Sequence, residues 1–430
     1  MSTRTRRRSG KSHRWLFALI TFVIIGVVIL MLMPMLVMNW VRGYLQEEAF
    51  RGKMEQIFGT QLQGKVALAP FRWTGDQVTS TEASVHTAHG WRATLDGLHL
   101  SIDWNGFRQG KWRTVGTGVD RVTLERTLVD PSAPVVAQDS SPTTPAGSSL
   151  PNWLRRYLPT QTEVDGIRVD RFTLIHPGPW NVRDSKVRIA GWQQGETSIQ
   201  AVAEGGILET PILLPAQTVP IKLNLTRASF RLSREDLHLK EATLQWLDAG
   251  EITAQGHFSP HEGSWEITTQ VVGIPLRECL SEDWKIRLSG NLKADLAAKG
   301  IGIASPLVTG KVELREGILT ALPILDQLAT YTGVERFKRL VLDIATANIR
   351  LAGDTRQFEN IVLQSNGLLR LEGRLTIQGD QINGDFLLGV TPETLKWIPG
   401  AQQHVFTSSI PSCPLGMTWT PLHLTGTMQA

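Results

Sequence analysis

Residues 287–296 read Arg-Leu-Ser-Gly-Asn-Leu-Lys-Ala-Asp-Leu, so polar residues alternate strictly with apolar or small ones. Successive side chains of a β-strand point to opposite faces of the sheet. The stretch therefore predicts a strand with one polar and one apolar face, and Gly290 lies on the apolar face between Leu288 and Leu292.

The same five-residue pattern, apolar-x-Gly-x-apolar with x any residue, recurs through the second half of the chain and is here called the frame. Glycine weakens the interior of a strand and usually marks a bulge, a tight bend or a close approach by another group. Repeated on the apolar face, it indicates a sheet that coils around its apolar side. The copies are Ala254–Phe258, Leu288–Leu292, Val308–Val312, Leu371–Leu375, Ile382–Phe386 and Leu424–Met428.

Alternation of period two also runs through much of the rest of the chain, whereas helical periodicity is scarce. About twenty half-buried strands present more apolar surface than a few helices can cover. Strands are expected from Val66 onward, among them Ile167–Ile175, Val182–Ile189, Ile221–Leu225 and Leu237–Trp246. Helical stretches are expected at Trp40–Phe58, Asn152–Leu158, Ala321–Tyr331 and Glu393–Trp397.

Two architectures can cover the apolar faces of these strands. A β-sandwich or barrel covers the faces with more sheet, and alternation alone favours it. An elongated, coiled, mostly antiparallel sheet would instead form an open groove, with lipid acyl chains as the missing layer. The side chains expected to line such a groove are Leu288, Leu292, Val312, Leu314, Leu371, Leu375 and Ile377.

The N-terminus predicts a single membrane anchor. Trp15 to Met38 contains no charged residue and is long enough to span a bilayer. Residues 1–14 are basic and contain no acidic residue, so the positive-inside rule keeps them in the cytoplasm and exports the rest. A cleaved signal peptide would have a shorter apolar region, followed by small residues at the cleavage site.

Charge and cysteine content exclude several classes of protein. The formal net charge is +4, and residues 1–14 hold six Lys or Arg, so the exported part is not basic. It therefore lacks the excess of positive charge that nucleic-acid-binding proteins use to contact phosphates. The two cysteines, Cys279 and Cys413, allow one disulfide or two free thiols. Residues 130–151 are rich in Pro, Ser, Thr and Ala, which predicts a flexible linker.

No arrangement of residues predicts catalysis, a metal or a cofactor. His257 and His261 have the spacing of a helical zinc pair, but Pro260 separates them and a third ligand is missing. Gly10-Lys11-Ser12 lacks the first glycine of a phosphate-binding loop and a strand before it. The expectation is a protein that is not an enzyme.

The overall pattern resembles the AsmA-like family, the AsmA and TamB group of anchored periplasmic proteins. A basic tail, one anchor and an amphipathic helix precede a strand at Gly64–Val66 and a ladder through Leu95–Ile102. This resembles the family's N-terminal part and implies such a region at 39–129. Gly310–Leu319, the helix after it, Leu342–Leu351 and Leu371–Ile377 resemble its C-terminal part, which implies a β-groove domain at 152–430.

The resemblance implies a single-pass protein of a bacterial inner membrane, with its bulk in the periplasm. Its groove would hold phospholipid acyl chains and aid phospholipid transport or outer-membrane biogenesis. Its partners would be membrane lipids, together with envelope proteins or further copies of the chain. Two other functions stay open: a non-catalytic scaffold for assembling envelope proteins, and an exported hydrolase with unrecognised catalytic residues.

Overall fold

The computed structural model shows a mainly β protein with few helices. It describes Gly43 and residues 48–61, 64–87, 90–103, 105–106, 111–126, 161–176, 181–193, 197–213, 218–233, 236–246, 250–259, 262–280, 282–301, 306–321, 325–326, 329–330, 333–397, 400, 405–406 and 416–427. The anchor predicted at 15–38, the basic tail, the linker at 130–151 and the turn at Asn152–Leu158 lie outside these residues. Within them, no helix is long and apolar enough to cross a membrane.

All described strands belong to one sheet of 21 strands. They are β1 Gly64–Leu68, β2 Arg72–Thr74, β3 Gln77–Thr87, β4 Trp91–Asp103, β5 Lys111–Arg126, β6 Gln161–Ile175, β7 Asn181–Gln193, β8 Ser198–Glu204, β9 Ile207–Leu213, β10 Thr218–Ser233, β11 Leu237–Trp246, β12 Gly250–Ser259, β13 Ser264–Pro275, β14 Leu288–Ile301, β15 Leu307–Thr320, β16 Arg339–Leu342, β17 Ile344–Ala352, β18 Thr355–Ser365, β19 Leu369–Gln378, β20 Gln381–Val390 and β21 Thr418–Thr427.

The strands pair almost entirely in the order of the sequence. In three places two consecutive strands pair with different parts of the same neighbouring strand. These are β1 and β2 along β3, β8 and β9 along β10, and β16 and β17 along β15. Every pairing is antiparallel except that of β5 with β6, which is parallel. Within the described strands no pairing joins β21 back to β1 or β2, so the sheet is neither a closed barrel nor a two-sheet sandwich.

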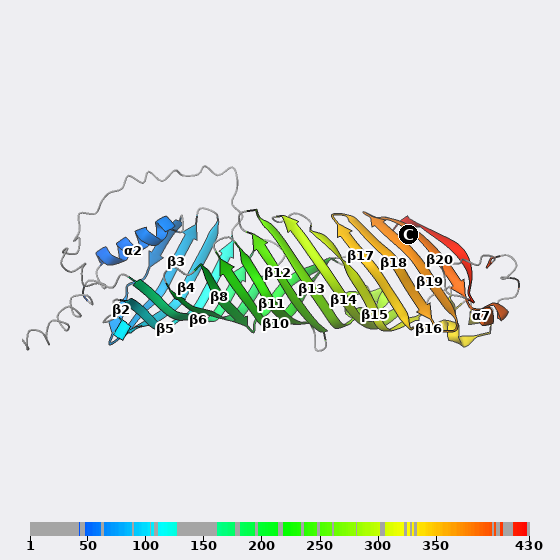
Figure 1. Cartoon of the computed structure of the whole chain (residues 1–430), viewed down its shortest axis with the longest axis horizontal. Helices are drawn as coiled ribbons and strands as arrows, with labels where there is room; N and C mark the ends of the chain where they lie inside the picture. Colours follow the sequence, from blue (N-terminus) through cyan, green and yellow to red (C-terminus); the bar gives the residue numbers. More distant parts are fainter. Residues whose placement is uncertain are drawn as a thin grey trace, which may run out of the picture.

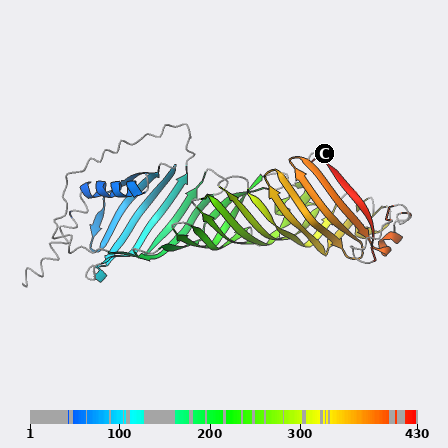
Figure 2. The same ribbon diagram turned by 45° about the horizontal axis from the view of Figure 1, so that its top comes forward.

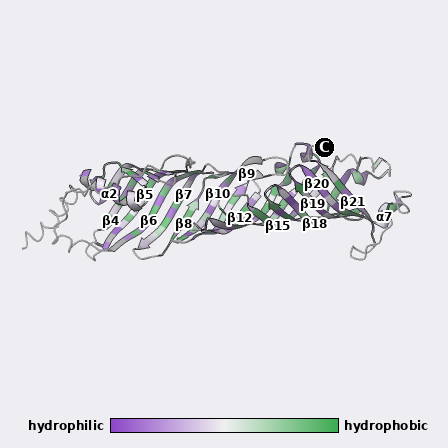
Figure 3. Ribbon diagram, turned by 90° about the horizontal axis from the view of Figure 1, so that it is seen from above, coloured by the Kyte–Doolittle hydropathy of each residue, from purple (hydrophilic) through white to green (hydrophobic). Residues whose placement is uncertain are grey.

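The sheet is long and strongly coiled. Figure 1 shows the strands following one another along the molecule, with the first strands at one end and β21 at the other. The view in Figure 2 shows the sheet winding about its long axis through the middle strands. In Figure 3 hydrophobic and hydrophilic segments alternate along individual strands, as expected for strands with two different faces.

Helices are short and lie at the margins of the sheet. They are α2 Glu48–Gln61, η1 Leu276–Cys279, α5 Glu282–Lys285, η2 Glu335–Lys338 and α7 Pro392–Lys396. The helix predicted at Glu393–Trp397 is confirmed as α7, whose first turn is capped by the Thr391 hydroxyl accepting from the Thr394 N–H. Of the helix predicted at Ala321–Tyr331, the described residues 325–326 and 329–330 are helical, whereas Ala321 is not and has a φ of 52°.

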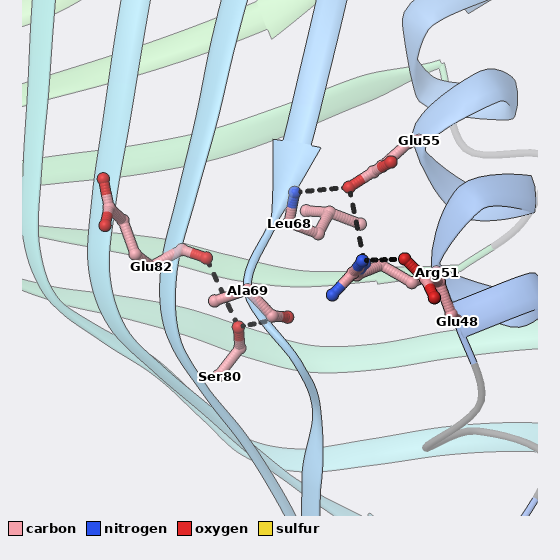
Figure 4. A network of polar contacts seen from close by, with 7 residues as sticks. All are labelled: Glu48, Arg51, Glu55, Leu68, Ala69, Ser80 and Glu82. Atoms are coloured by element: carbon pink, nitrogen blue, oxygen red, sulfur yellow. Dashed lines mark hydrogen bonds and ion pairs between the residues drawn. The ribbon is translucent and has the colours of Figure 1, made fainter.

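Helix α2 is tied to the first strands by polar contacts (Figure 4). The Glu55 carboxylate accepts a hydrogen bond of 2.8 Å from the backbone N–H of Leu68 at the end of β1. Arg51 bridges Glu55 to Glu48, at 3.9 and 3.0 Å. The Ser80 hydroxyl lies within hydrogen-bond distance of the carbonyls of Ala69 and Glu82. The Glu55 bond fixes the helix against this end of the sheet, and the Ser80 bonds hold the first strands to one another.

Candidate functional site

The apolar face of the sheet carries one unbroken row of cross-strand partners, here called the central row. It runs from β3 to β21 and contains only apolar residues, glycine and two hydroxyl residues, Ser80 and Thr269. Its members are Ser80, Leu98, Val119, Val169, Val187, Ala203, Ala228, Ala242, Ala254, Thr269, Leu296, Gly310, Ile349, Phe358, Leu375, Gly384 and Leu424.

The row beside it, on the other face, is polar throughout. It is offset by one residue from the central row, so its side chains point the opposite way. Its members are Lys186, Glu204, Arg227, Thr243, Thr253, Gln270, Asp295, Lys311, Asn348 and Glu359. The one-faced sheet predicted from residues 287–296 therefore extends over most of the molecule.

Exposure divides the central row into two parts. From β3 to β11 most of its members are buried, including Val119 at 4% and Ala228 at 3%. From Ala254 on β12 to Leu375 on β19 they are half-buried, Gly384 on β20 is buried, and Leu424 on the last strand is 50% exposed. The C-terminal part of the row is therefore the part most accessible to a ligand.

All seven predicted groove residues lie on the face of the central row, in two groups. Leu288 and Leu292 on β14 lie beside Val312 and Leu314 on β15, and Leu292 is the direct cross-strand partner of Leu314. The second group, on β19, is separated from the first by β17 and β18. It consists of Leu371, Leu375 and Ile377. Six of the seven are half-buried and Ile377 is buried, at 5% exposure.

Part of this face is filled by the protein itself. Leu292 and Val312 pack against the largest apolar cluster, whose buried members include Trp246 and Ile274. The cluster follows the face from β7 to β15 and is contacted by Cys279 of η1. Burial, and then the neighbouring Glu278 carboxylate, raise the pKa of the Cys279 thiol to about 11. Cys279 is a free thiol, and Cys413 lies outside the described residues.

Large side chains lie over several glycines of neighbouring strands. A Leu314 methyl group on β15 lies where a side chain on Gly290 of β14 would project, and on the opposite face the Trp419 ring of β21 lies over Gly389 of β20 in the same way. These two glycines therefore do not leave holes in the surface of the sheet. They allow a bulky neighbour to lie flat against the sheet, which sequence periodicity cannot reveal because the partner is on another strand.

The residues that sequence reasoning missed close one margin of the C-terminal sheet. Phe337 of η2 is fully buried and meets the Trp397 ring edge to face, with ring centroids 6.1 Å apart. Leu325 and Ala329 join the same cluster. Phe406 packs with Leu395 of α7 and Val390 in a further cluster. The apolar stripe at Ala321–Tyr331 was the available signal, but it did not show which strands the helix would cover.

Charged groups with shifted pKa values lie away from the central row. On the polar face, hydrogen bonds from Arg374 and then from His423 lower the pKa of Asp385. At the far ends of β5 and β6, desolvation and then the Arg126 charge lower the pKa of His176. Within the described residues, no group of three His, Cys, Asp or Glu side chains could hold a metal ion.

Comparison with known proteins identifies no relative. No family model, no curated protein and no solved structure matches the chain.

Proposed function

We propose that this chain is a membrane-anchored, non-enzymatic carrier that holds lipid acyl chains against the apolar face of its sheet. In this proposal it aids phospholipid transport or outer-membrane biogenesis in a bacterial envelope, as the AsmA-like resemblance implies. The acyl chains lie along the C-terminal part of the central row, between Ala254 and Leu424, where the apolar face is least covered.

The observation that carries this proposal is the continuity of the central row. A catalytic site needs a few polar groups converging on one point, whereas this face offers an uncharged track across neighbouring strands. With strands about 4.8 Å apart, the row is about 80 Å long. A track of this kind suits a long apolar ligand that changes position.

Energetics supports passive holding of acyl chains. Burying one methylene group gains about 0.8 kcal/mol, so a partly covered chain gains several kcal/mol from contact with the row. Because the side chains along the row are similarly apolar, the gain changes little as the chain moves by one strand. Movement then meets small barriers and needs no chemical step in this domain.

Mass spectrometry of lipid retained after mild detergent extraction tests the proposal. We expect phospholipid to co-purify with the full chain and to be reduced several-fold in Leu296→Asp. The matched control is Asp295→Asn, which changes the next residue on the polar face. Equal lipid content in both variants and the unchanged chain, or none in any of them, would reject the carrier function.

The anchor at Trp15–Met38 is part of the proposal and has its own test. A reporter that is active only outside the cytoplasm should work when fused after Gln429 and fail when fused before Trp15. The uncharged span and the basic residues before it are the reason for this orientation. The reverse pattern would place the sheet on the wrong side of the membrane.

A scaffold for envelope proteins is the second candidate, and the free edge of β21 favours it. The strand pairs only with β20 among the described strands, and Leu422 and Leu424 are exposed. A client strand could pair with this edge, although Pro421 lacks one backbone donor. A second proline, Thr425→Pro, should then abolish co-purification of a client protein and leave lipid retention intact.

A further inference from the structure

The polar face of the sheet has a hollow lined by basic and imidazole side chains. Its volume is about 460 Å³, and it lies over β10 to β13. The side chains that can carry positive charge are Arg231, His238, Lys240 and His257, and Glu266 is the acidic residue of the lining. Leu239, Gln255, Gly256 and Thr268 complete it.

Strand register brings these groups together. Arg231 on β10 is the cross-strand partner of His238 on β11, and His238 is the partner of His257 on β12. The two imidazole rings lie with their centroids 6.2 Å apart. Lys240 stands two residues from His238, at the irregularity in the pairing between β11 and β12, and therefore reaches the same hollow.

The two permanent cations of the hollow are Arg231 and Lys240. Within the described part of the chain, Arg231 and Lys240 form no ion pair and no side-chain hydrogen bond, and both side chains are exposed. Three carboxylates lie close to them: Glu266, the partner of His257, Asp236, which lies 4.0 Å from the His238 imidazole, and the exposed Glu241, which follows Lys240. Lys299 on β14, the cross-strand partner of Glu266, lies on the same face.

A second hollow on the same face shows that this lining is not a general property of the sheet. It has a volume of about 480 Å³ over β12 to β15, and Asp295 is its only charged lining residue. The other polar residues of its lining are Thr253, Gln255, Thr268, Thr269, Gln270 and Thr309. Positive charge is therefore concentrated over β10 to β12.

We propose that the hollow formed by Arg231, His238, Lys240 and His257 binds a phosphate ester. A guanidinium presents two parallel N–H donors that match phosphate oxygens, and an ammonium and imidazoles add further donors. The hollow is larger than phosphate alone, so it has room for the esterified group beside Glu266.

The position of the hollow allows two sources of phosphate. On the apolar face directly behind it, Leu232 and Phe258 are 43% and 37% exposed, close to the turns that end β10 and β12. A lipid whose acyl chains lie on that face could place its headgroup over this margin, and this source rests on the proposed function. A soluble phosphate ester needs no lipid and would bind to the same donors.

Calorimetry on the detergent-solubilised full chain tests the site with glycerol 3-phosphate. We expect Arg231→Gln with Lys240→Gln to weaken binding at least tenfold, because both permanent charges are lost. Glu266→Gln should strengthen it several-fold, since it removes the opposing carboxylate. Lys311→Gln, an exposed charge on the same face over β15, is the control and should leave the affinity unchanged.

Retention of anionic phospholipid compared with diacylglycerol, which has no phosphate, separates the two sources. If the double variant loses phospholipid and retains diacylglycerol, the site holds a lipid headgroup. If it loses only glycerol 3-phosphate binding, the ligand is soluble. The inference is wrong if neither probe distinguishes the double variant from Lys311→Gln. If the double variant and Lys311→Gln retain the same amount of lipid, the carrier function is still supported but this site takes no part in it.

Discussion

At the scale of single residues, the glycine frames have two physical roles that look identical in the sequence. At Gly310 and Gly373 an added Cβ would collide with the backbone carbonyls of Asp295 and Asp385 on the neighbouring strands. At Gly426, in the last copy of the frame, an added Cβ would meet nothing within 4 Å. The frame predicted that another group comes close to each glycine. This is so at Gly310 and Gly373, whereas Gly426 lies in an edge strand and faces open space.

This contrast predicts opposite results for the same substitution. Gly310→Ala should destabilise the fold by about 1–3 kcal/mol, because a backbone carbonyl cannot move aside without distorting the ladder. Gly426→Ala should leave stability unchanged or raise it by up to about 1 kcal/mol, because alanine loses less entropy in a strand. Thermal unfolding of both variants measures this. Equal melting temperatures would show that the sheet tolerates a Cβ at position 310.

At the scale of elements, the edge strand β21 is linked to β19 and β20 by a triplet of polar side chains on the polar face. Arg374 on β19 donates to the Asp385 carboxylate at 2.8 and 3.0 Å, and His423 on β21 lies 2.9 Å from its other oxygen. These contacts lower the pKa of Asp385 from its ordinary value of 3.8. Because the folded-state pKa is depressed, the stabilisation is complete above pH 4 and is lost as the pH falls through the lower value.

Asp385→Asn should therefore lower the melting temperature slightly at pH 7, by no more than a few degrees because the triplet is solvent-exposed. The difference from the unchanged chain should disappear toward pH 2. Asp380→Asn, in the turn between β19 and β20, serves as the control with little effect at either pH. A difference that persists at pH 2 would mean that the carboxylate charge is not what holds β21.

Several elements could be predicted from the sequence, whereas their neighbours could not. Strand β11 has the bounds predicted for Leu237–Trp246, because apolar residues alternate with polar ones on both sides of a slip at Lys240–Glu241. The parallel pairing of β5 with β6 was missed, since nothing in either strand records the direction of its partner. The strand predicted at Ile221–Leu225 proved far longer, as β10. Irregular positions in its pairing with β11 obscured the alternation.

The parallel pairing makes a prediction about the segment between the two strands. Lys111 pairs with Gln161 and Glu125 with Ile175, so the chain must return about 45 Å from the end of β5 to the start of β6. Deleting residues 130–151 leaves a connection that reaches this distance only when fully extended, about 45 Å. The deletion should lower the melting temperature by several degrees, while a Gly/Ser replacement of equal length should not. Equal stability of both variants would argue against the parallel pairing.

At the scale of the whole molecule, the central row depends on register as much as on sequence pattern. Alternation predicted which residues share a face, and it placed all seven groove candidates correctly on one face. It could not predict that Leu296, Gly310 and Ile349 stand side by side, because the pattern within one strand does not set its register against the next strand. Nor could it predict that the N-terminal part of the row is buried and the C-terminal part half-exposed.

Photo-crosslinking at neighbouring residues of single strands tests most directly whether lipid lies on the apolar face. Probes would replace Leu296, Val312 and Leu375 on that face and, one residue earlier, Asp295, Lys311 and Arg374 on the polar face. The account predicts phospholipid adducts at the first three positions and none at the second three. Adducts at both sets alike, or crosslinks only to protein at Leu296 and Leu375, would contradict it.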